Sequence, residues 1–323
     1  MALYLVTGGA GFIGSHIAEE LLRRGEHVRV YDDFSTGKLA NLQFPGLEAQ
    51  MTASLEVVEG DIRDLVSVRA VMDGVDYVLH QAALPSVVRS VIDPLSSNEV
   101  NVTGTLNVLI AARDENVRRV VYASSSSVYG NTPTLPKHEE MQTEPLSPYA
   151  VSKLAGERYC IAFHEVYKLP TVCIRYFNVF GPRQDPTSQY SAVIPKFITA
   201  LLRNEAPVIY GDGLQSRDFT YVANVVKANL LACERGTAVG IVMNIACGER
   251  RTLIDLHRDF VTLTGKNIQP IFGEERKGDV KHSMASIELA KTKLGYCTDV
   301  DWMTGLEKTV EWYTAQLNKK PGN

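Results

Sequence analysis

The chain has 323 residues, of which 45% are hydrophobic and 22% charged, and its formal net charge is −4 at pH 7. This length exceeds one average domain, and the composition is that of an ordinary globular protein. The acidic balance and the lack of any Lys/Arg block argue against a nucleic-acid partner. The opening run, MALYLVTGGAGFIG, is too short for a membrane span and follows no charged segment, so we expect no membrane partner and a cytoplasmic location.

Apolar runs with strand character alternate with helical patterns through the first half of the chain. The predicted strands are 3–8, 27–33, 55–61, 76–83, 118–126 and 170–179, and the predicted helices are 12–25, 64–74, 96–116 and one that begins at 147. This alternation predicts an α/β fold with a doubly wound parallel sheet (Rossmann) covered on both faces. We therefore expect a domain over residues 1–180 and a smaller C-terminal α/β lobe over 181–323, with some interleaving of segments.

The five cysteines are scattered along the sequence and odd in number. They form no CxxC pair and no cluster with histidine, so the sequence predicts neither a metal site nor a disulfide framework. Reduced thiols in a cytosolic protein fit this pattern best.

A glycine-rich segment, TGGAGFIG, follows the first predicted strand and opens the first predicted helix. Its glycines suit a tight turn, a close approach of backbone N–H groups to a pyrophosphate, and close helix packing. The next strand ends in Asp32, 18 residues after Gly14, where a carboxylate accepts hydrogen bonds from ribose hydroxyls and repels a 2′-phosphate. This context predicts an NAD site with the cofactor-binding candidates Gly8, Gly11, Phe12, Ile13, Gly14 and Asp32.

Two later strand ends carry further cofactor candidates. Ligands of such a sheet bind at the carboxyl ends of its strands, where the sequence places Gly60-Asp61-Ile62 and Gln81-Ala82-Ala83. The candidates for the adenine and ribose pocket are Asp61, Ile62, Gln81, Ala82 and Ala83. We also place Asn101 and Tyr176 among the cofactor-binding residues.

A serine run and a tyrosine–lysine pair follow near the same edge of the predicted sheet. The run ASSSSVYG (123–130) ends a strand, and in SPYAVSK (147–153) Ser147 caps a helix that has Pro148 as its first residue. Tyr149 and Lys153 then lie one turn apart on the same helix face. Either pattern alone also fits an ordinary loop or an amphipathic helix, but together they predict a Ser/Tyr/Lys group for hydride transfer.

The chemistry explains why these residue types belong together. A base must take the proton of an alcohol as hydride leaves its carbon, and tyrosine, with a pKa of about 10, is too weakly ionised at neutral pH to act unaided. A nearby lysine ammonium and the positive nicotinamide both favour tyrosinate and so lower that pKa. A serine hydroxyl orients the alcohol and polarises the forming carbonyl.

These motifs, together with RYFNVFGPRQDP (175–186), VIPKF (193–197), YGDGLQSRDFTYV (210–222) and RKGDVKHS (276–283), resemble the extended short-chain dehydrogenase/reductase family over nearly the whole chain. Within that family the sequence is most similar to UDP-hexose 4-epimerases, particularly those of UDP-N-acetylglucosamine and UDP-N-acetylgalactosamine. The resemblance implies an isomerase with a retained NAD. Hydride would leave C4 of the hexose, the 4-keto sugar would turn over, and the hydride would return to its opposite face.

The resemblance also implies roles for single residues. Tyr149 matches the base, Lys153 assists it and holds the nicotinamide ribose, and Ser125 matches the catalytic serine or threonine. Ser126 and Ser127 stand where the related 4,6-dehydratases have an Asp-Glu pair. Two serines do not readily supply that acid and base, so dehydration is disfavoured.

The second lobe carries the other residues that the resemblance implicates in substrate binding. Asn178 matches a substrate-contacting asparagine, and Ser283 matches a gate beside the sugar's 2-substituent, where a small residue admits an N-acetyl group. Arg217 and Arg276 match positions that bind the UDP phosphates, because arginine offers a fixed fork of donors. The full set of substrate candidates is Ser125, Ser126, Tyr149, Asn178, Val193, Tyr210, Arg217, Arg276, Asp279 and Ser283.

Three alternatives remain open at this point. A UDP-glucuronate 4-epimerase or decarboxylase would use the same NAD site, but it needs a pocket for the C6 carboxylate. A dehydrogenase that exchanges its NAD fits less well, as does a non-catalytic NAD-binding regulator, since such proteins commonly lose the tyrosine or the lysine. The resemblance further implies a homodimer formed through the helices near 96–116 and 147–168.

Overall fold

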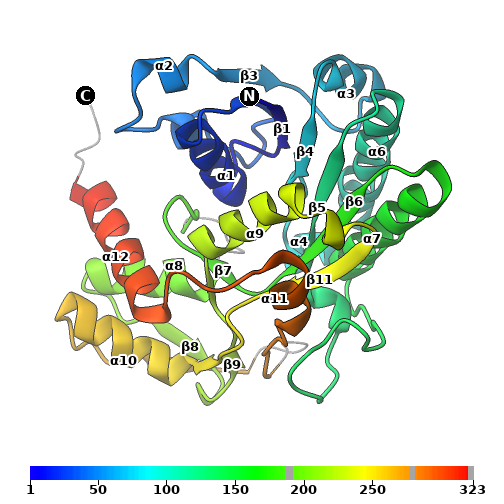
Figure 1. Cartoon of the computed structure of the whole chain (residues 1–323). Helices are drawn as coiled ribbons and strands as arrows, with labels where there is room; N and C mark the ends of the chain where they lie inside the picture. Colours follow the sequence, from blue (N-terminus) through cyan, green and yellow to red (C-terminus); the bar gives the residue numbers. More distant parts are fainter. Residues whose placement is uncertain (187–191, 276–280, 319–323) are drawn as a thin grey trace.

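The chain folds into a large parallel sheet with helices on both faces and a smaller region of short strands and helices beside it (Figure 1). The computed structural model describes residues 1–186, 192–275 and 281–318. In Figure 1 the smaller region, with α8, α10 and α12, lies at the lower left, away from the sheet.

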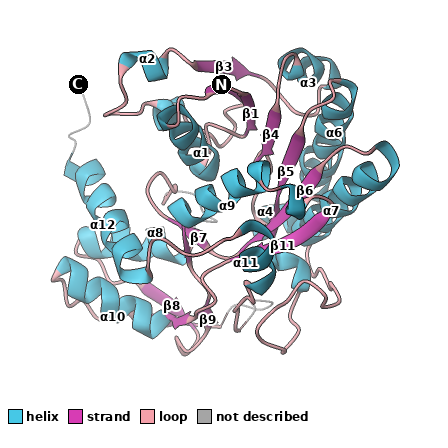
Figure 2. Cartoon of the chain, viewed as in Figure 1, coloured by secondary structure: helices cyan, strands magenta, loops and turns pink. Residues whose placement is uncertain are grey.

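Seven strands form the main sheet in the order β11-β6-β5-β4-β1-β2-β3, and every neighbouring pair is parallel. They run side by side in Figure 2. Tyr4 and Val6 of the first strand pack into one core while Leu5 between them packs into the other, so the sheet is apolar on both faces. The strands are β1 (Leu3–Thr7), β2 (His27–Asp32), β3 (Leu55–Glu59), β4 (Tyr77–His80), β5 (Arg119–Ser125), β6 (Thr171–Tyr176) and β11 (Ile241–Ile245).

In the part of the chain that the structure describes, three two-stranded sheets lie outside the main sheet. β7 (Val179–Phe180) pairs with β10 (Thr220–Tyr221), β9 (Ser216–Arg217) with β12 (Arg251–Thr252), and β8 (Val208–Tyr210) with β13 (Ile271–Gly273).

Helices cover the two faces of the main sheet separately. α1 (Phe12–Arg23) and α9 (Val222–Glu234) pack together on one face, and α3 (Leu65–Met72), α6 (Thr105–Asp114) and α7 (Pro148–Tyr167) pack on the other. The remaining helical elements are η1 (Leu39–Leu42), α2 (Ala49–Thr52), α4 (Val87–Ile92), α5 (Pro94–Asn98), η2 (Glu99–Gly104), η3 (Ser126–Tyr129), α8 (Val193–Leu202), η4 (Gly236–Ala238), α10 (Leu253–Thr264), α11 (Glu288–Leu294) and α12 (Trp302–Asn318).

The fold confirms the predicted doubly wound parallel sheet and refines two of its details. The sheet has a seventh strand, β11, which comes from beyond residue 180 and pairs with β6. The helix predicted over 96–116 is divided into α5, a π-helical turn at η2, and α6. As predicted, Ser147 caps α7, because its hydroxyl accepts the Ala150 N–H at 3.1 Å, and Pro148 is the first helical residue.

The described residues hold neither a membrane-spanning helix nor a cluster of metal ligands. Within 1–186, 192–275 and 281–318, no helix has the length and apolar character needed to span a bilayer. In the same ranges, no three His, Cys, Asp or Glu side chains are grouped so that they could hold a metal ion. All five cysteines are free thiols.

Candidate active site

The glycine-rich turn between β1 and α1 is shaped to receive a phosphate group. Gly8 has a positive φ of 67°, and a Cβ on Gly14 would come within 2.2 Å of the Gly8 carbonyl oxygen. Gly11 is the N-cap of α1 and brings no side-chain cap, so the first N–H groups of the helix are left for a ligand. With the positive end of the helix dipole, these groups fit the pyrophosphate of a dinucleotide.

Asp32, at the end of β2, is hydrogen-bonded to the backbone of this turn. Its carboxylate oxygens accept the N–H groups of Ala10 and Phe34, both at 2.9 Å, and the residue is 7% exposed. Burial raises the pKa of Asp32, and the two hydrogen bonds oppose the rise. Because a carboxylate has about four acceptor positions, it keeps capacity for the ribose hydroxyls that the sequence assigned to it.

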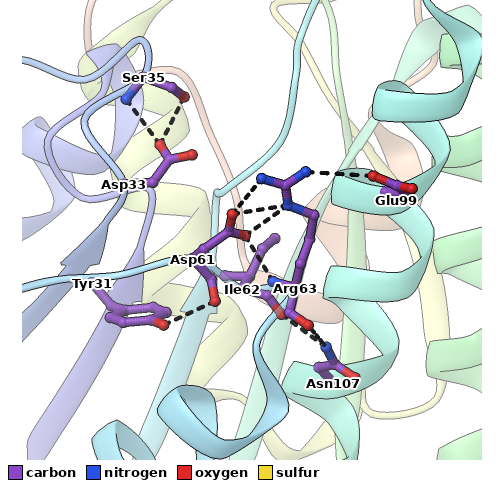
Figure 3. Close-up of polar contacts among 8 residues, drawn as sticks. All are labelled: Tyr31, Asp33, Ser35, Asp61, Ile62, Arg63, Glu99 and Asn107. Carbon is purple, nitrogen blue, oxygen red and sulfur yellow. Dashed lines mark hydrogen bonds and ion pairs between the residues drawn. The ribbon is translucent and has the colours of Figure 1, made fainter.

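Two of the residues predicted for the adenine and ribose pocket, Asp61 and Ile62, lie after β3 and are held by several neighbours (Figure 3). The Arg63 guanidinium contacts the Asp61 carboxylate through Nε at 2.8 Å and Nη2 at 2.5 Å and lowers its pKa. Tyr31 donates its hydroxyl to the Asp61 carbonyl at 3.0 Å, and Asn107 Nδ2 donates to the carbonyls of Ile62 and Arg63. Arg63 and Asn107 were missed from the sequence because their partners become visible only in the fold.

The cofactor candidates after β4 and β6 meet in one polar cluster. Tyr176 donates its hydroxyl to Gln81 Oε1 at 3.0 Å, and both side chains contact the amide of Asn229 on α9. Ala82 lies against the glycine turn, where a Cβ on Gly8 would come within 2.7 Å of its backbone, and Ala83 is partly exposed beside it. Asn229 was missed, since it sits in the apolar helical stretch VVKANLLAC.

A buried chain of hydrogen bonds runs from the ends of β1 and β4 toward α7, the helix that carries Tyr149. His80 contacts Thr7 Oγ1 through Nδ1 at 2.6 Å and Thr105 Oγ1 through Nε2 at 2.9 Å. Thr105 donates to the Asn101 carbonyl, so Nε2 of His80 carries the proton. Burial lowers the pKa of His80 to about 3, which keeps the ring neutral.

Asn101 continues this chain to α7. Its Nδ2 donates to Ser152 Oγ at 3.0 Å, and Ser152 donates in turn to the Tyr149 carbonyl at 2.8 Å. The side chain of Asn101 is 1% exposed and also accepts the Leu84 N–H at 2.8 Å. Asn101, which the sequence predicts as a cofactor residue, therefore joins the segment at Leu84 to α7 through Ser152.

The predicted Ser/Tyr/Lys group comes together at the ends of β5 and the start of α7. A hydrogen bond with Ser125 lowers the pKa of Tyr149, while burial, the larger effect, raises it. Lys153 is 4% exposed, donates from Nζ to the Ala123 carbonyl at 2.9 Å, and has a pKa lowered by burial to about 8. Ser126 follows Ser125 as the first residue of η3. The lowering of the Tyr149 pKa by Lys153 stays a prediction.

A buried ion pair between Glu157 and Arg175 lies next to these catalytic candidates. Glu157, one turn after Lys153, accepts two hydrogen bonds from Arg175 at 2.8 Å and one from Ser124 at 2.5 Å. Both charged side chains are almost fully buried, so breaking the pair would leave an uncompensated charge. The network fixes α7 against β5 and β6. In the sequence, this pair is visible only as charged residues inside apolar segments.

The predicted substrate residues beyond β6 lie on several elements, and two of them, Arg217 and Ser283, are in or bonded to β9. Asn178 Nδ2 donates to the Asp218 carbonyl at 3.0 Å, Arg217 donates to the carbonyls of Ser216 and Lys281 at 3.1 Å, and the Ser283 N–H donates to the Ser216 carbonyl at 3.0 Å. Tyr210 ends β8 and is 40% exposed, and Val193 begins α8 and is partly buried. Arg276 and Asp279 lie outside the described residues.

Sheet register connects the two groups of candidates. Ser125 at the end of β5 lies opposite Tyr176 at the end of β6, and Asn178 follows two residues later. The cofactor candidates, Ser125 and Asn178 thus lie at the carboxyl edge of the main sheet, where parallel α/β sheets bind their ligands. An alcohol placed at Ser125 and Tyr149 could give up its proton beside a bound dinucleotide. Fold and site together define a dinucleotide-dependent enzyme of the extended short-chain dehydrogenase/reductase type.

The chain belongs to the NAD dependent epimerase/dehydratase family, whose sequence profile matches residues 4–246. Its cofactor is accordingly NAD, and the uncapped helix start at Gly11 and the close packing at Gly14 fit that molecule.

Three known proteins illustrate the likeness. A UDP-N-acetylglucosamine 4-epimerase from Methanobrevibacter ruminantium M1, solved with UDP-N-acetylmuramic acid, is 42% identical, with a TM-score of 0.92 over 98% of this chain and 99% of that one. A UDP-glucose 4-epimerase from Mycolicibacterium smegmatis is 38% identical over 96% of this chain and 97% of its own length. A UDP-glucuronic acid 4-epimerase from Bacillus cereus, solved with UDP-glucuronic acid and NAD, is 32% identical, with a TM-score of 0.88 over 98% of this chain and 99% of that one.

Proposed function

We propose that this protein is a UDP-hexose 4-epimerase that interconverts UDP-N-acetylglucosamine and UDP-N-acetylgalactosamine, and also UDP-glucose and UDP-galactose, through a transient 4-keto sugar. The observation that carries the proposal is the placement of Ser125 at the end of β5 and of Tyr149 and Lys153 one turn apart at the start of α7, at the edge of the sheet that holds the glycine-rich turn. The epimerase activities of the similar proteins support the same assignment.

The chain's own residues would carry the proton and orient the sugar. When bound, NAD supplies a reversible acceptor for the hydrogen and electron pair on C4 of the hexose. Tyr149 takes the O4 proton as the carbonyl forms and gives it back in the reverse step, and Ser125 donates a hydrogen bond to the same oxygen. Lys153 favours tyrosinate through its charge. After the 4-keto sugar turns over, the same groups restore the alcohol with inverted configuration.

The residues beside this pair favour epimerisation over dehydration. Elimination of water across C5 and C6 needs an acid and a base near C6, and Ser126 and Ser127 occupy the positions that follow Ser125. Serine hydroxyls are poor general acids and bases at neutral pH. The 4-keto sugar would therefore keep its C6 oxygen until it is reduced again.

A UDP-glucuronate 4-epimerase or decarboxylase is the second candidate, and one observation is compatible with it. The hydroxyl of Ser127 is buried and, in the described structure, has no hydrogen-bond partner. A buried unpaired hydroxyl is costly and is readily satisfied by a ligand oxygen. A C6 carboxylate offers such an oxygen, as does a C6 hydroxyl, so substrate comparison must decide between them.

The decisive experiment uses the purified protein with no added cofactor. UDP-N-acetylglucosamine, UDP-glucose and UDP-glucuronate are incubated separately, and the products are resolved by chromatography. Conversion of the first two to their C4 epimers is expected. Turnover of UDP-glucuronate alone would transfer the function to the second candidate, and activity that needs added NAD would contradict the retained cofactor.

We also propose that the protein acts as a homodimer. Large apolar side chains stand exposed on α4 and α5, which pack against α7.

A further inference from the structure

Asp218 is a fully buried carboxylate, at 0% exposure, in the middle of the smaller region. Its oxygens accept three backbone N–H groups, from Cys247 at 3.0 Å, Gly248 at 3.1 Å and Ala285 at 3.1 Å. Burial raises the pKa of Asp218 to about 7, against the opposing effect of these three donors. A carboxylate in such a place is costly, so its three bonds must offset a large desolvation penalty.

The three N–H donors lie on two segments that are far apart in the sequence. Cys247 and Gly248 follow β11, the edge strand of the main sheet, whereas Ala285 lies in the loop two residues after Ser283. The main-chain carbonyl of Asp218 meanwhile accepts Asn178 Nδ2 at 3.0 Å, which ties in the segment after β6. One residue thus joins the NAD-bearing sheet to the loops of the smaller region.

The same short stretch carries the candidate contacts to the nucleotide-sugar. Arg217 precedes Asp218 directly, and the Ser283 N–H is bonded to the Ser216 carbonyl. Ser216 and His282 are also joined through Oγ and Nδ1 at 2.9 Å. These contacts hold Arg217 beside the segment that ends at Ser283, and the Asp218 carboxylate joins this group to the end of β11 and to Ala285.

We infer that Asp218 is a positioning residue that fixes the UDP-binding half of the site against the sheet without itself contacting substrate. This inference rests on the proposed function, since it takes Arg217 as a UDP-phosphate contact. Removing the negative charge would weaken the bonds of this stretch to the end of β11 and to Ala285, so Arg217 would shift relative to the main sheet. Binding of the nucleotide would weaken, while the catalytic group on β5 and α7 would be left as it is.

The test compares UDP binding by calorimetry in the NAD-loaded wild type and in Asp218→Asn. The amide keeps the shape of the carboxylate, but its NH₂ group would face one of the three N–H donors. We expect the Kd for UDP and the KM for the sugar nucleotide to rise about tenfold, the change that loss of one hydrogen bond to a charged acceptor gives. We expect kcat and the bound NAD content to change less than twofold.

Two further variants serve as references. Asp301→Asn removes a carboxylate that accepts the Thr304 N–H at the start of α12, and it should leave UDP affinity unchanged. Arg217→Ala removes the proposed phosphate contact itself and should weaken UDP binding at least as much as Asp218→Asn. If Asp218→Asn does not fold, Ser216→Ala is used instead, because it loses only the side-chain bond to His282. In this variant the Kd for UDP should rise about two- to threefold, since a neutral hydrogen bond is worth less than one to a charged acceptor.

The outcomes separate the inference from the proposed function. If Arg217→Ala weakens UDP binding while Asp218→Asn lowers only the melting temperature, Asp218 is merely structural and the inference is wrong. An equal loss of kcat and of NAD would also overturn it, because the effect would then extend beyond the UDP half. If the wild type fails to bind UDP, the proposed function itself fails.

Discussion

At the scale of single residues, the hydroxyl of Tyr149 is subject to opposing influences. Burial raises its pKa, and the hydrogen bond with Ser125 opposes the rise. The phenol is therefore protonated at neutral pH when NAD is absent. Tyr149→Phe removes the base and leaves the ring in place. We expect kcat to fall about 10²- to 10⁴-fold, the usual contribution of a positioned acid–base group.

The measurement pairs the epimerase rate of Tyr149→Phe with the NAD released on denaturation. NAD content should match that of the wild type, because the glycine-rich turn and Asp32 are untouched. Tyr159→Phe, on the same helix and partly buried, serves as the control and should keep full activity. Loss of NAD from Tyr149→Phe would mean that the tyrosine holds the cofactor rather than acting as the base.

Lys153 makes stability depend on pH in a defined direction. Burial lowers its pKa to about 8 from 10.5, so between these values the unfolded chain binds more protons than the folded one. The stability contribution is full above pH 10.5 and is lost as the pH falls through 8, a difference of about 3 kcal/mol. Relative to Lys153→Met, the wild type should therefore gain stability from pH 7 to pH 10.

Urea unfolding of both proteins at pH 7 and pH 10 measures this difference. Other titrating groups cancel in the comparison, since the two chains differ at one position. A gap between the two free energies of unfolding that stays constant with pH would show that Lys153 keeps its ordinary pKa in the fold.

Ser283 provides a residue-scale test of substrate choice. Its N–H is bonded to the Ser216 carbonyl, an interaction that a side-chain change preserves, so Ser283→Tyr should fold normally. The ring would fill the space proposed for the N-acetyl group. We expect turnover of UDP-N-acetylglucosamine to fall at least tenfold while UDP-glucose, the internal control, is still epimerised. Full activity on the N-acetyl sugar would contradict the gate.

At the scale of elements, the turn between β1 and α1 can pack closely only because Gly14 has no side chain. A Cβ on Gly14 would meet the Gly8 carbonyl oxygen at 2.2 Å, so Gly14→Ala must push the helix away from the turn. We expect a lower melting temperature and loss of bound NAD, measured by thermal unfolding and by NAD released on denaturation. Gly236→Ala is the matched control, because nothing lies within 4 Å of its added Cβ and its φ is not positive. Retained NAD in Gly14→Ala would contradict the close packing.

The elements also show which features a sequence can predict. The central strands of the main sheet were predictable because burial on both faces demands continuous apolar runs. The glycines of the turn, and Tyr149 with Lys153, were predictable because their spacing in the sequence is enough to bring them together. The pairing of β11 with β6 was not, since it depends on which strand reaches the sheet edge in three dimensions. Asp218 lay inside a quoted motif, yet its partners at 247, 248 and 285 are joined to it only by the fold.

At the scale of the whole molecule, one surface is more apolar than an isolated chain would favour. Val88, Val91, Ile92 and Leu95 of α4 and α5 are 52%, 64%, 70% and 75% exposed. These helices pack on α7, and Ser90 Oγ accepts the Tyr149 N–H at 3.0 Å, so the surface adjoins the catalytic helix. Contiguous exposed apolar residues mark interaction sites, and a second copy of the chain related by a twofold axis would cover the same patch on both subunits.

The oligomeric state tests this interface directly. The wild type should elute as a dimer in size-exclusion chromatography with light scattering, and the double change Val91→Lys with Ile92→Lys should give a monomer, because it buries two charges in each half of an apolar contact. Val66→Lys is the control: Val66 is 76% exposed but lies on α3, so the dimer should persist. A monomeric wild type, or a lysine double variant that stays dimeric, would place the contact elsewhere. Since α4 bonds directly to the backbone of Tyr149, a monomeric variant should also show a lower kcat with its NAD retained, which would make dimerisation part of how the catalytic helix is held in place.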